Sequence, residues 1–307
     1  LVSTVEAGLG RWWAWLLVVD VVAAAALAQL VIMKTVADVT ALATGVDATV
    51  WGVVWAVVLA VGLAGGGYRF AELGAKLVVS LVVLAFVGSL FVVPVDLGAA
   101  AGGTVPSLPT ADTALVAAGI LGGAVHVTLV TMQSYTMRER GWTREDWGLA
   151  RFDVVASMGV AFGVYSLAIF LVAASVFHEG PVPLAELTAT SAATALGPAV
   201  GGLGESLFLA GLLGAAVSTL GGNTTVPPYA LADRLDWDRD DDRYRAAVAV
   251  TALAAALGPV MGGNVFELLV LVLAFGLVGT PFAIALVLYL LHDPGTVPER
   301  PPVLASL

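Results

Sequence analysis

The residues with the clearest chemical potential lie around two adjacent glycines in an apolar stretch. Gly122 and Gly123 interrupt a segment that otherwise resembles a membrane-spanning helix, and His126 follows three residues later. Glycine is a poor residue for a helix interior and permits unwinding. Unwound backbone at membrane depth exposes carbonyl oxygens that can coordinate a cation, and the half-helix ends add fixed dipoles. Alternatively, the glycines allow close helix packing, and these residues alone do not separate the two interpretations.

A histidine and several hydroxyls accompany the glycines. His126 is a titratable side chain within a span, which makes it a functional candidate, and Thr128 and Thr131 follow on the next turn. Ser218 and Thr219 place further hydroxyls in a later apolar segment. We predict that these side chains line an ion pathway. The alternatives are structural: the imidazole would bond a neighbouring carbonyl, and the hydroxyls would bond back to the carbonyl four residues earlier.

Long apolar helices are needed to position these residues in a bilayer, and the composition supplies them. Of the 307 residues, 59% are hydrophobic and 12% are charged, whereas soluble domains carry about 25% charged residues. The alternating segments of a membrane β-barrel are absent. We predict an all-α, polytopic membrane protein with a single transmembrane domain over residues 1–307. Eight segments are expected to span the membrane: Trp12–Met33, Thr49–Ala64, Leu77–Val95, Thr113–Tyr135, Phe152–Phe177, Gly204–Gly222, Ala246–Met261 and Val265–Leu291.

The basic residues fall almost entirely on one side of the predicted membrane. If the eight spans alternate in direction, 12 of the 13 Lys and Arg residues lie on one face, and only Lys34 lies on the other. Cytoplasmic loops carry such an excess of positive charge. The pattern predicts a multi-pass protein of the plasma membrane, with both ends of this chain in the cytoplasm.

Charge and residue types limit the classes of function. The net charge is −10, cysteines are absent, and the acidic loop Asp236–Asp242 argues against nucleic-acid binding. Arginine outnumbers lysine, which together with the acidity suits a halophilic archaeon, although a GC-rich genome also favours arginine. The sequence contains no nucleophile–base pair, phosphate-binding glycine loop or hydrolase-type metal cluster. We therefore predict that the protein is not an enzyme and has no cofactor.

The stretch from Gly123 to His178 has a characteristic order of residues. His126 is followed twelve residues later by Arg138. The next helix opens with Arg151-Phe152-Asp153 and ends with Val176-Phe177-His178. This order resembles helices six and seven of the Nramp divalent-metal transporter family, where a Met-Pro-His-Asn segment precedes an arginine and an Arg-(apolar)-Asp element. Weaker matches lie at Gly67–Glu72, Leu207–Ala215 and Gly279–Phe282.

The resemblance carries expectations about fold and ligands. It implies an inverted-repeat fold of the LeuT type, with the substrate held at the midplane between two broken helices. It aligns this chain, which starts at Leu1 and not at a methionine, with family helices three to ten. The first two helices, including the helix-one metal motif, are then expected upstream. A divalent metal ion would be the substrate and the lipid bilayer the surrounding partner, while the oligomeric state stays open.

Helix six departs from the family pattern at the implied ion site. The family methionine falls on Ala124, and the alanine three residues before it falls on Leu121. A second family histidine falls on Thr131. By this resemblance, Leu121, Gly122 and Ala124 form the substrate-ion site of an unwound helix.

Helix three departs from the family pattern as well. The family has three acidic residues there that form a proton route. They fall on Asp20, Ala26 and Gln29, so only the first carboxylate is retained. Asp20 and Gln29 are therefore the candidates for this part of the transport pathway, although the position of Asp20 near a span end also suits an interfacial charge.

These departures favour a hard ion and weak proton coupling. Losing the thioether removes a soft ligand for Mn²⁺ or Fe²⁺, and a smaller side chain leaves room for the waters that Mg²⁺ retains. Both changes resemble the Nramp-related magnesium transporters, whereas the bulk of Leu121 argues against a wider pocket. The alternatives are a proton-coupled Mn²⁺/Fe²⁺ symporter, a non-transporting Nramp-like sensor or scaffold, and a carrier of an organic solute.

Overall fold

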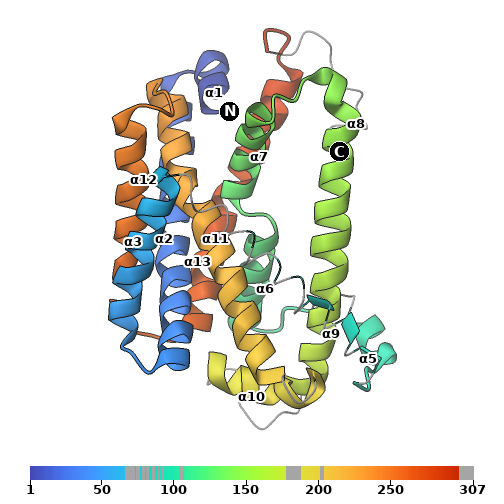
Figure 1. Ribbon diagram of the computed structural model, residues 1–307. Helices are drawn as coiled ribbons and strands as arrows, with labels where there is room; N and C mark the ends of the chain where they lie inside the picture. The colour runs from blue at the N-terminus through green and yellow to red at the C-terminus, as the bar shows by residue number, and fades with distance from the viewer. Residues whose placement is uncertain are drawn as a thin grey trace.

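The computed structural model is a bundle of helices, with α10 lying across one end (Figure 1). It describes residues 1–65, 73, 77, 80, 83–84, 87–88, 90–91, 93–103, 105, 107–177, 188–200 and 204–296. In chain order the elements are α1 Val2–Leu9, α2 Arg11–Thr44, α3 Ala48–Gly65, α5 Leu97–Gly102, α6 Ala111–Ala124, α7 Val127–Glu139, η1 Arg144–Asp146, α8 Trp147–Val154, η2 Val155–Val164, α9 Tyr165–Phe177, α10 Ala189–Val200, α11 Gly204–Leu235, α12 Asp242–Ala254, η4 Ala255–Val260 and α13 Val265–His292.

Several of these helices have the length and composition of membrane spans. In the described part of the chain, four stretches qualify: Arg11–Thr44, Ala111–Glu139, Arg144–Phe177 and Val265–His292. No strand occurs in the same part. The all-α, polytopic class predicted from the sequence is therefore confirmed. The predicted span Leu77–Val95 falls largely outside the described residues.

Two helices extend beyond the predicted membrane spans. α2 continues past Met33 to Thr44 and ends where Gly45 adopts a left-handed φ of 74° and its N–H bonds to the carbonyl of Ala41. A glycine in this conformation is a common helix terminator. α11 continues past Gly222 and through two prolines to Leu235. In both cases the polar residues that follow the apolar segment, and that suggested the end of the span, still belong to the helix.

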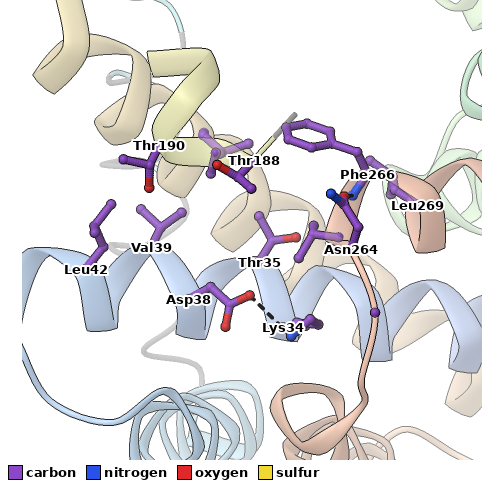
Figure 2. A pocket seen from close by; sticks show the side chains of 14 residues that line it. Lys34, Thr35, Asp38, Val39, Leu42, Thr188, Thr190, Asn264, Phe266 and Leu269 are labelled. Carbon is purple, nitrogen blue, oxygen red and sulfur yellow. Dashed lines mark hydrogen bonds and ion pairs between the residues drawn. The ribbon is translucent and has the colours of Figure 1, made fainter. Parts of the chain in front are cut away.

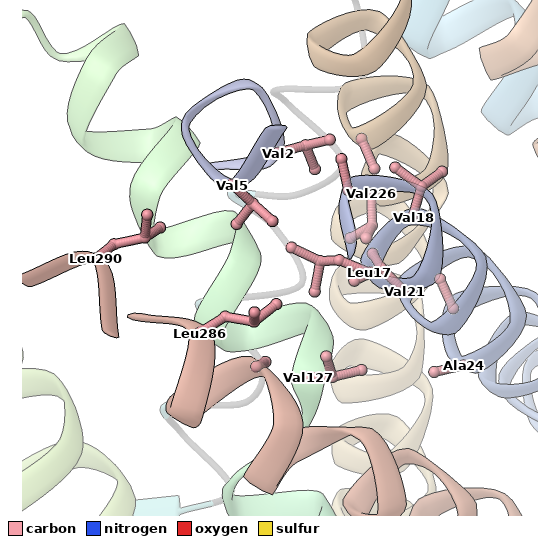
Figure 3. Packing of buried hydrophobic residues seen from close by; sticks show 14 residues of the cluster. Val2, Val5, Leu17, Val18, Val21, Ala24, Val127, Val226, Leu286 and Leu290 are labelled. Atoms are coloured by element: carbon pink, nitrogen blue, oxygen red, sulfur yellow. The ribbon is translucent and has the colours of Figure 1, made fainter. Parts of the chain in front are cut away.

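Two buried apolar clusters pack the bundle around α2. The first joins α2 to α1, α7, α11 and α13, and Figure 3 shows its side chains converging between these helices. The second joins α2 to α3, α11, α12 and η4. Many of the buried positions are alanines, which let membrane helices approach closely. Residues central to these clusters are Leu17, Val21, Val127 and Leu286 in the first, and Met33, Leu59 and Leu220 in the second.

One buried carboxylate ties together the end of the bundle that carries the basic loops. Asp233, near the end of α11, accepts hydrogen bonds from the backbone N–H of Val2 at 2.8 Å and from the hydroxyl of Tyr135 at 2.9 Å. The adjacent Arg234 forms an ion pair with Glu6 at 2.9 Å. These contacts fasten α1 and the end of α7 to the end of α11.

Candidate functional site

The helix that contains the paired glycines is broken, but not at the glycines. α6 ends at Ala124, α7 begins at Val127, and Val125 and His126 between them have non-helical backbone angles, of which those of His126 are extended. Gly122 and Gly123 are both helical. The predicted position of the unwinding was therefore wrong by a few residues, although an interruption does lie in this span.

Close packing against α13 explains why the glycines stay helical. A Cβ atom on Gly122 would lie 1.9 Å from the carbonyl oxygen of Leu273, and one on Gly119 would lie 3.0 Å from the carbonyl oxygen of Val270. No side chain fits at the first of these positions without moving backbone. For Gly122 the structure thus supports the packing interpretation.

Side chains near the break satisfy the backbone groups that it exposes. The first N–H groups and the last carbonyls of any helix have no partner within that helix. The imidazole Nδ1 of His126 accepts from the N–H of Thr128 at 3.4 Å and lies 2.8 Å from its hydroxyl oxygen, so His126 caps α7. On the other side, the Thr280 hydroxyl of α13 donates to the carbonyl of Val125 at 2.7 Å.

Two polar atoms beside the break have no hydrogen-bond partner among the described residues. They are Nε2 of His126 and Oδ2 of Asp20, and both are buried. A Cβ atom on Gly276 would lie 1.9 Å from the first, and one on Gly279 would lie 1.8 Å from the second. Side chains three residues apart on a helix have Cβ atoms about 5–6 Å apart, so the two unpaired atoms lie within about 10 Å of each other. Unpaired buried groups of this kind are common where a ligand or water binds.

The other residues predicted in this span have mixed environments. Thr131 is fully buried and its hydroxyl bonds back to the carbonyl of Val127 at 2.9 Å. The side chain of Leu121 is 55% exposed, and Ala124 is half-buried. The bulk that Leu121 was expected to place in the pocket therefore lies on the outward side of α6. The structure places His126 against Thr128, with Asp20 one turn along α13 from the imidazole, and leaves the side chain of Leu121 outside this group.

Gln29 belongs to a different contact, between α2 and α11. Its side-chain amide donates to the carbonyl of Leu220 at 3.3 Å and to the hydroxyl of Thr224, and it accepts from Asn223 at 3.1 Å. Asn223 also donates to the carbonyl of Ala25 at 2.7 Å. This network satisfies a neutral amide completely and joins the two helices.

The hydroxyls predicted on α11 lie near this network but do not join it. Thr219 is exposed and bonds back to the carbonyl of Ala215 at 2.8 Å, which is the structural alternative considered for it. Ser218 is half-buried. Asn223 and Thr280 were not among the site residues predicted from the sequence. Both are polar residues inside apolar helices, and that signal alone would have found them.

The described side chains at the break do not form a cluster of metal-ligating groups. No group of three or more His, Cys, Asp or Glu side chains converges within the described ranges. The hydroxyl of Thr128 lies against Nδ1 of His126 and the carbonyl of Val125 accepts from Thr280, so Oδ2 of Asp20 and Nε2 of His126 are the atoms near the break that are left for a ligand.

The sequence of the chain matches the model of one protein family over almost its whole length. The model of the family described as "Natural resistance-associated macrophage protein-like" (Nramp) matches residues 1–300. The chain belongs to the Nramp family. The resemblance inferred from the residues between Gly123 and His178 is thereby confirmed.

Several bacterial Nramp relatives are similar to parts of the chain. Each is named "Divalent metal cation transporter MntH". The protein from Granulibacter bethesdensis is 32% identical over 161 residues, which are 50% of this chain and 36% of the relative. Those from Pectobacterium carotovorum and Deinococcus radiodurans are 31% and 28% identical over 64% and 71% of this chain, and over 49% and 50% of their own lengths. The chain thus spans about half the length of these relatives or less.

Proposed function

We propose that this Nramp chain is part of a carrier that moves a divalent cation across the plasma membrane by alternating access. The observation that carries the proposal is the interruption at Val125 and His126, which lies beside the unpaired atoms of His126 and Asp20. Irregular backbone persists at membrane depth only where it is buried in protein or lines a cavity. The relatives, which are named as divalent metal cation transporters, support the same class of substrate.

The ion that we propose is hard and partly hydrated, with Mg²⁺ as the leading candidate. The proposed site comprises the α6 end, Leu121, Gly122 and Ala124, where Leu121 contributes only its backbone because its side chain points outward. Ala124 supplies no sulfur and little bulk. Since Mg²⁺ gives up water reluctantly, a small side chain at the site favours it over ions that a thioether would select.

The proposed pathway runs from the break along α2 and α7. His126, Thr128 and Thr131 line it from α7, and Asp20 lines it from α2. Gln29, Ser218 and Thr219 would extend it along the contact between α2 and α11. A neutral, fully bonded amide at Gln29 cannot carry a proton as a carboxylate would, which supports weak or absent proton coupling.

The orientation that we propose follows the basic residues. Asp233, Arg234 and the loops that hold most of the arginines lie at one end of the bundle, and we assign this end to the cytoplasm. Both ends of the chain are then cytoplasmic, and Lys34 lies toward the outside.

An uptake assay in proteoliposomes that contain the full-length protein tests the ion preference. We expect faster uptake of Mg²⁺ than of Mn²⁺, and we expect Ala124→Met to shift the preference toward Mn²⁺ because it adds a soft ligand. Ile120→Met is the matched control, since this α6 side chain is 62% exposed and faces away from the break. If neither ion is transported before or after the change at Ala124, the carrier proposal is wrong.

A proton-coupled Mn²⁺/Fe²⁺ symporter is the second candidate, and the unpaired Asp20 and His126 side chains favour it. Both are titratable groups near the break. A pH-sensitive dye inside the same proteoliposomes separates the two candidates. Acidification that accompanies uptake in the wild type and disappears in Asp20→Asn would support the symporter, whereas ion uptake without acidification supports the first candidate.

A further inference from the structure

The two halves of the broken span are held in place in different ways. α6 packs on α13 through glycines, and a Cβ atom on Gly122 would lie 1.9 Å from the backbone oxygen of Leu273. Helices packed this closely cannot shift without separating. The far end of α7 is held instead by side-chain hydrogen bonds and ring contacts, which water can replace. Because Val125 and His126 between the halves are non-helical, they form a hinge about which α7 can turn while α6 stays in place.

A buried hydrogen bond joins the end of α7 to α11. The hydroxyl of Tyr135 donates to Oδ2 of Asp233 at 2.9 Å, and both side chains are less than a tenth exposed. The ring of Tyr135 also stacks on that of Tyr229 in α11, with ring centroids 5.6 Å apart. The same carboxylate oxygen accepts from the N–H of Val2 at 2.8 Å. A hydrogen bond to a charged group is about twice as strong as one between neutral groups, so this contact is the firmest point between α7 and α11.

A second and more exposed set of contacts lies one turn further along α7. Glu139, the last residue of this helix, contacts the hydroxyl of Tyr229 and the guanidinium of Arg239. Arg239 belongs to the loop between α11 and α12, and its guanidinium carbon lies 4.5 Å from the centre of the Tyr229 ring. The side chains of Glu139 and Arg239 are 37% and 48% exposed. Because water screens these charges, this set holds α7 less firmly than the buried hydrogen bond does.

Both sets of contacts border a polar cavity at the end of the bundle that we assign to the cytoplasm. The cavity has a volume of about 550 Å³ and lies between the last turns of α7, the end of α11 and the loop that follows. Tyr135, Glu139 and Asp233 are among its lining residues. The cavity brings water to these side chains, so water can take over their hydrogen bonds when the contacts open.

The cavity at the opposite end of the bundle is built differently. It has a volume of about 280 Å³ and lies between the last turns of α2, the first turn of α10 and the start of α13. Figure 2 shows the apolar side chains of Val39, Leu42 and Phe266 in its lining. Its charged pair, Lys34 and Asp38, lies within the single helix α2 at 3.4 Å. That pair ties no helices together, whereas the polar contacts beside α7 join separate helices.

We propose that Tyr135 and Asp233 form a latch that closes the cytoplasmic side of the broken span, with Glu139, Tyr229 and Arg239 as its weaker outer part. When the latch is closed, α7 lies against α11. When it opens, α7 turns about the break, moves away from α11 and uncovers a path from the break to the cytoplasm. The inference rests on the proposed transport function for the direction in which the ion leaves, but the opening itself does not depend on transport.

The length of α7 couples the latch to the break. Tyr135 follows His126 by nine residues in one uninterrupted helix, which corresponds to about 14 Å at a rise of 1.5 Å per residue. A movement of the latched end therefore also turns the first residues of α7, including Thr128. Opening of the latch thus changes the surroundings of the imidazole beside the break.

The reaction of one introduced cysteine with a maleimide, in the purified full-length protein, tests the latch. The chain has no cysteine, so Ala232→Cys is the reporter once any cysteines in the rest of the protein have been replaced. Ala232 lines the cavity but is only 8% exposed. We expect Tyr135→Phe, which removes the hydroxyl and keeps the ring, to speed this reaction about tenfold. Glu139→Gln should speed it about two- to threefold, because its contacts are partly exposed.

Two controls separate opening of the latch from other effects. Tyr289→Phe removes the hydroxyl of a 50% exposed tyrosine near the end of α13 and should leave the rate at Ala232→Cys unchanged. Ala56→Cys places a reporter at a fully buried position of the second apolar cluster, and it should stay unreactive when combined with Tyr135→Phe. If Tyr135→Phe speeds the reaction at Ala232→Cys no more than Tyr289→Phe does, or speeds it equally at Ala56→Cys, the latch is wrong.

Uptake measurements in proteoliposomes separate this inference from the proposed function. An external ion binds the form that is closed toward the cytoplasm, so Tyr135→Phe should raise the KM for external Mg²⁺ relative to Tyr289→Phe. If the cysteine reactions follow the prediction and no variant transports, the latch stands and the carrier proposal falls. If uptake occurs and neither its KM nor the cysteine reaction responds to Tyr135→Phe, the carrier proposal stands and the latch falls.

Discussion

Residues that disfavour helices have opposite effects in two parts of the molecule. One is the span made of α6 and α7, and the other is helix α11. The first contains Gly122 and Gly123, which stay helical, and breaks at Val125 and His126, where no glycine or proline occurs. The second contains two consecutive prolines, Pro227 and Pro228, and continues without interruption to Leu235. Helix propensity alone predicts the reverse in both places.

The difference lies in the partners available to the backbone. At the break, His126 and Thr280 bond the N–H and carbonyl groups that a continuous helix would satisfy itself. Along α11, Pro227 and Pro228 have no N–H for the carbonyls of Asn223 and Thr224. The side-chain amide of Asn223 holds this turn of the helix against α2 through the carbonyl of Ala25. Neighbouring side chains, more than local propensity, decide where a membrane helix stays regular.

The largest expected effect comes from Gly122→Ala. The new Cβ atom would lie 1.9 Å from the carbonyl oxygen of Leu273, so α6 and α13 must separate. We expect the free energy of unfolding to fall by about 3 kcal/mol and transport to be lost. Gly123→Ala is the matched control, because its nearest contact is the flexible side chain of Leu273 at 3.4 Å. Equal melting temperatures for the two variants would contradict the packing role of Gly122.

A smaller effect is expected from Gly276→Ala, which acts on the break through His126. The added Cβ atom would lie 1.9 Å from Nε2 of His126 and would push the ring out of its capping position. Loss of a helix cap costs about 1 kcal/mol, and crowding adds to it, so we expect destabilisation of about 2 kcal/mol together with slower ion uptake. Gly262→Ala, which has no neighbour within 4 Å, should leave the melting temperature and uptake unchanged.

Thr280→Val removes one hydroxyl at the break, which lies within hydrogen-bond distance of the carbonyls of Val125 and Gly276. The substitution keeps the shape of the side chain and removes the donor to the carbonyl of Val125, so thermal unfolding should show a loss of about 1 kcal/mol. Thr219→Val removes an exposed hydroxyl on the regular helix α11 and should change stability by less than about 0.5 kcal/mol. If both substitutions have the same effect, Thr280 has no special role at the break.

The smallest effect is expected from Pro228→Ala in α11. Proline in an isolated helix interior costs about 3 kcal/mol relative to alanine. Because α11 already continues through this residue, we expect a gain below about 1 kcal/mol and unchanged uptake. A gain near the full cost of an isolated helix would show that the prolines strain α11 and that its neighbours do not compensate for them.

The sequence predicted the class of fold better than the details of the site. Apolar segments and the distribution of arginines are properties of whole segments, so the helical, membrane-spanning character followed from them directly. The family followed from the order of residues around His126 and Asp153. The ends of α2 and α11 could not be derived from the sequence. The end of α2 depends on Gly45 adopting a left-handed φ, and the length of α11 depends on its contacts with α2.

The position of the break could not be predicted from the sequence either, because it too depends on contacts between helices. It depends on Thr280, which is 155 residues from Val125 in sequence, and on the fit of Gly122 against Leu273. The unpaired atoms of Asp20 and His126 are buried against Gly279 and Gly276 of α13, where any larger side chain would collide with them. Such relations exist between helices and leave no local pattern in the sequence.

The contact between Asp233 and the N–H of Val2 sets an order for biogenesis. The two residues are 231 positions apart, so a ribosome must complete α11 before the carboxylate that anchors α1 exists. Chains emerge N-terminus first, at about 5–20 residues per second. The α1 segment therefore waits on the order of ten seconds or more after its own synthesis, and its docking is a late event in the assembly of this end of the protein.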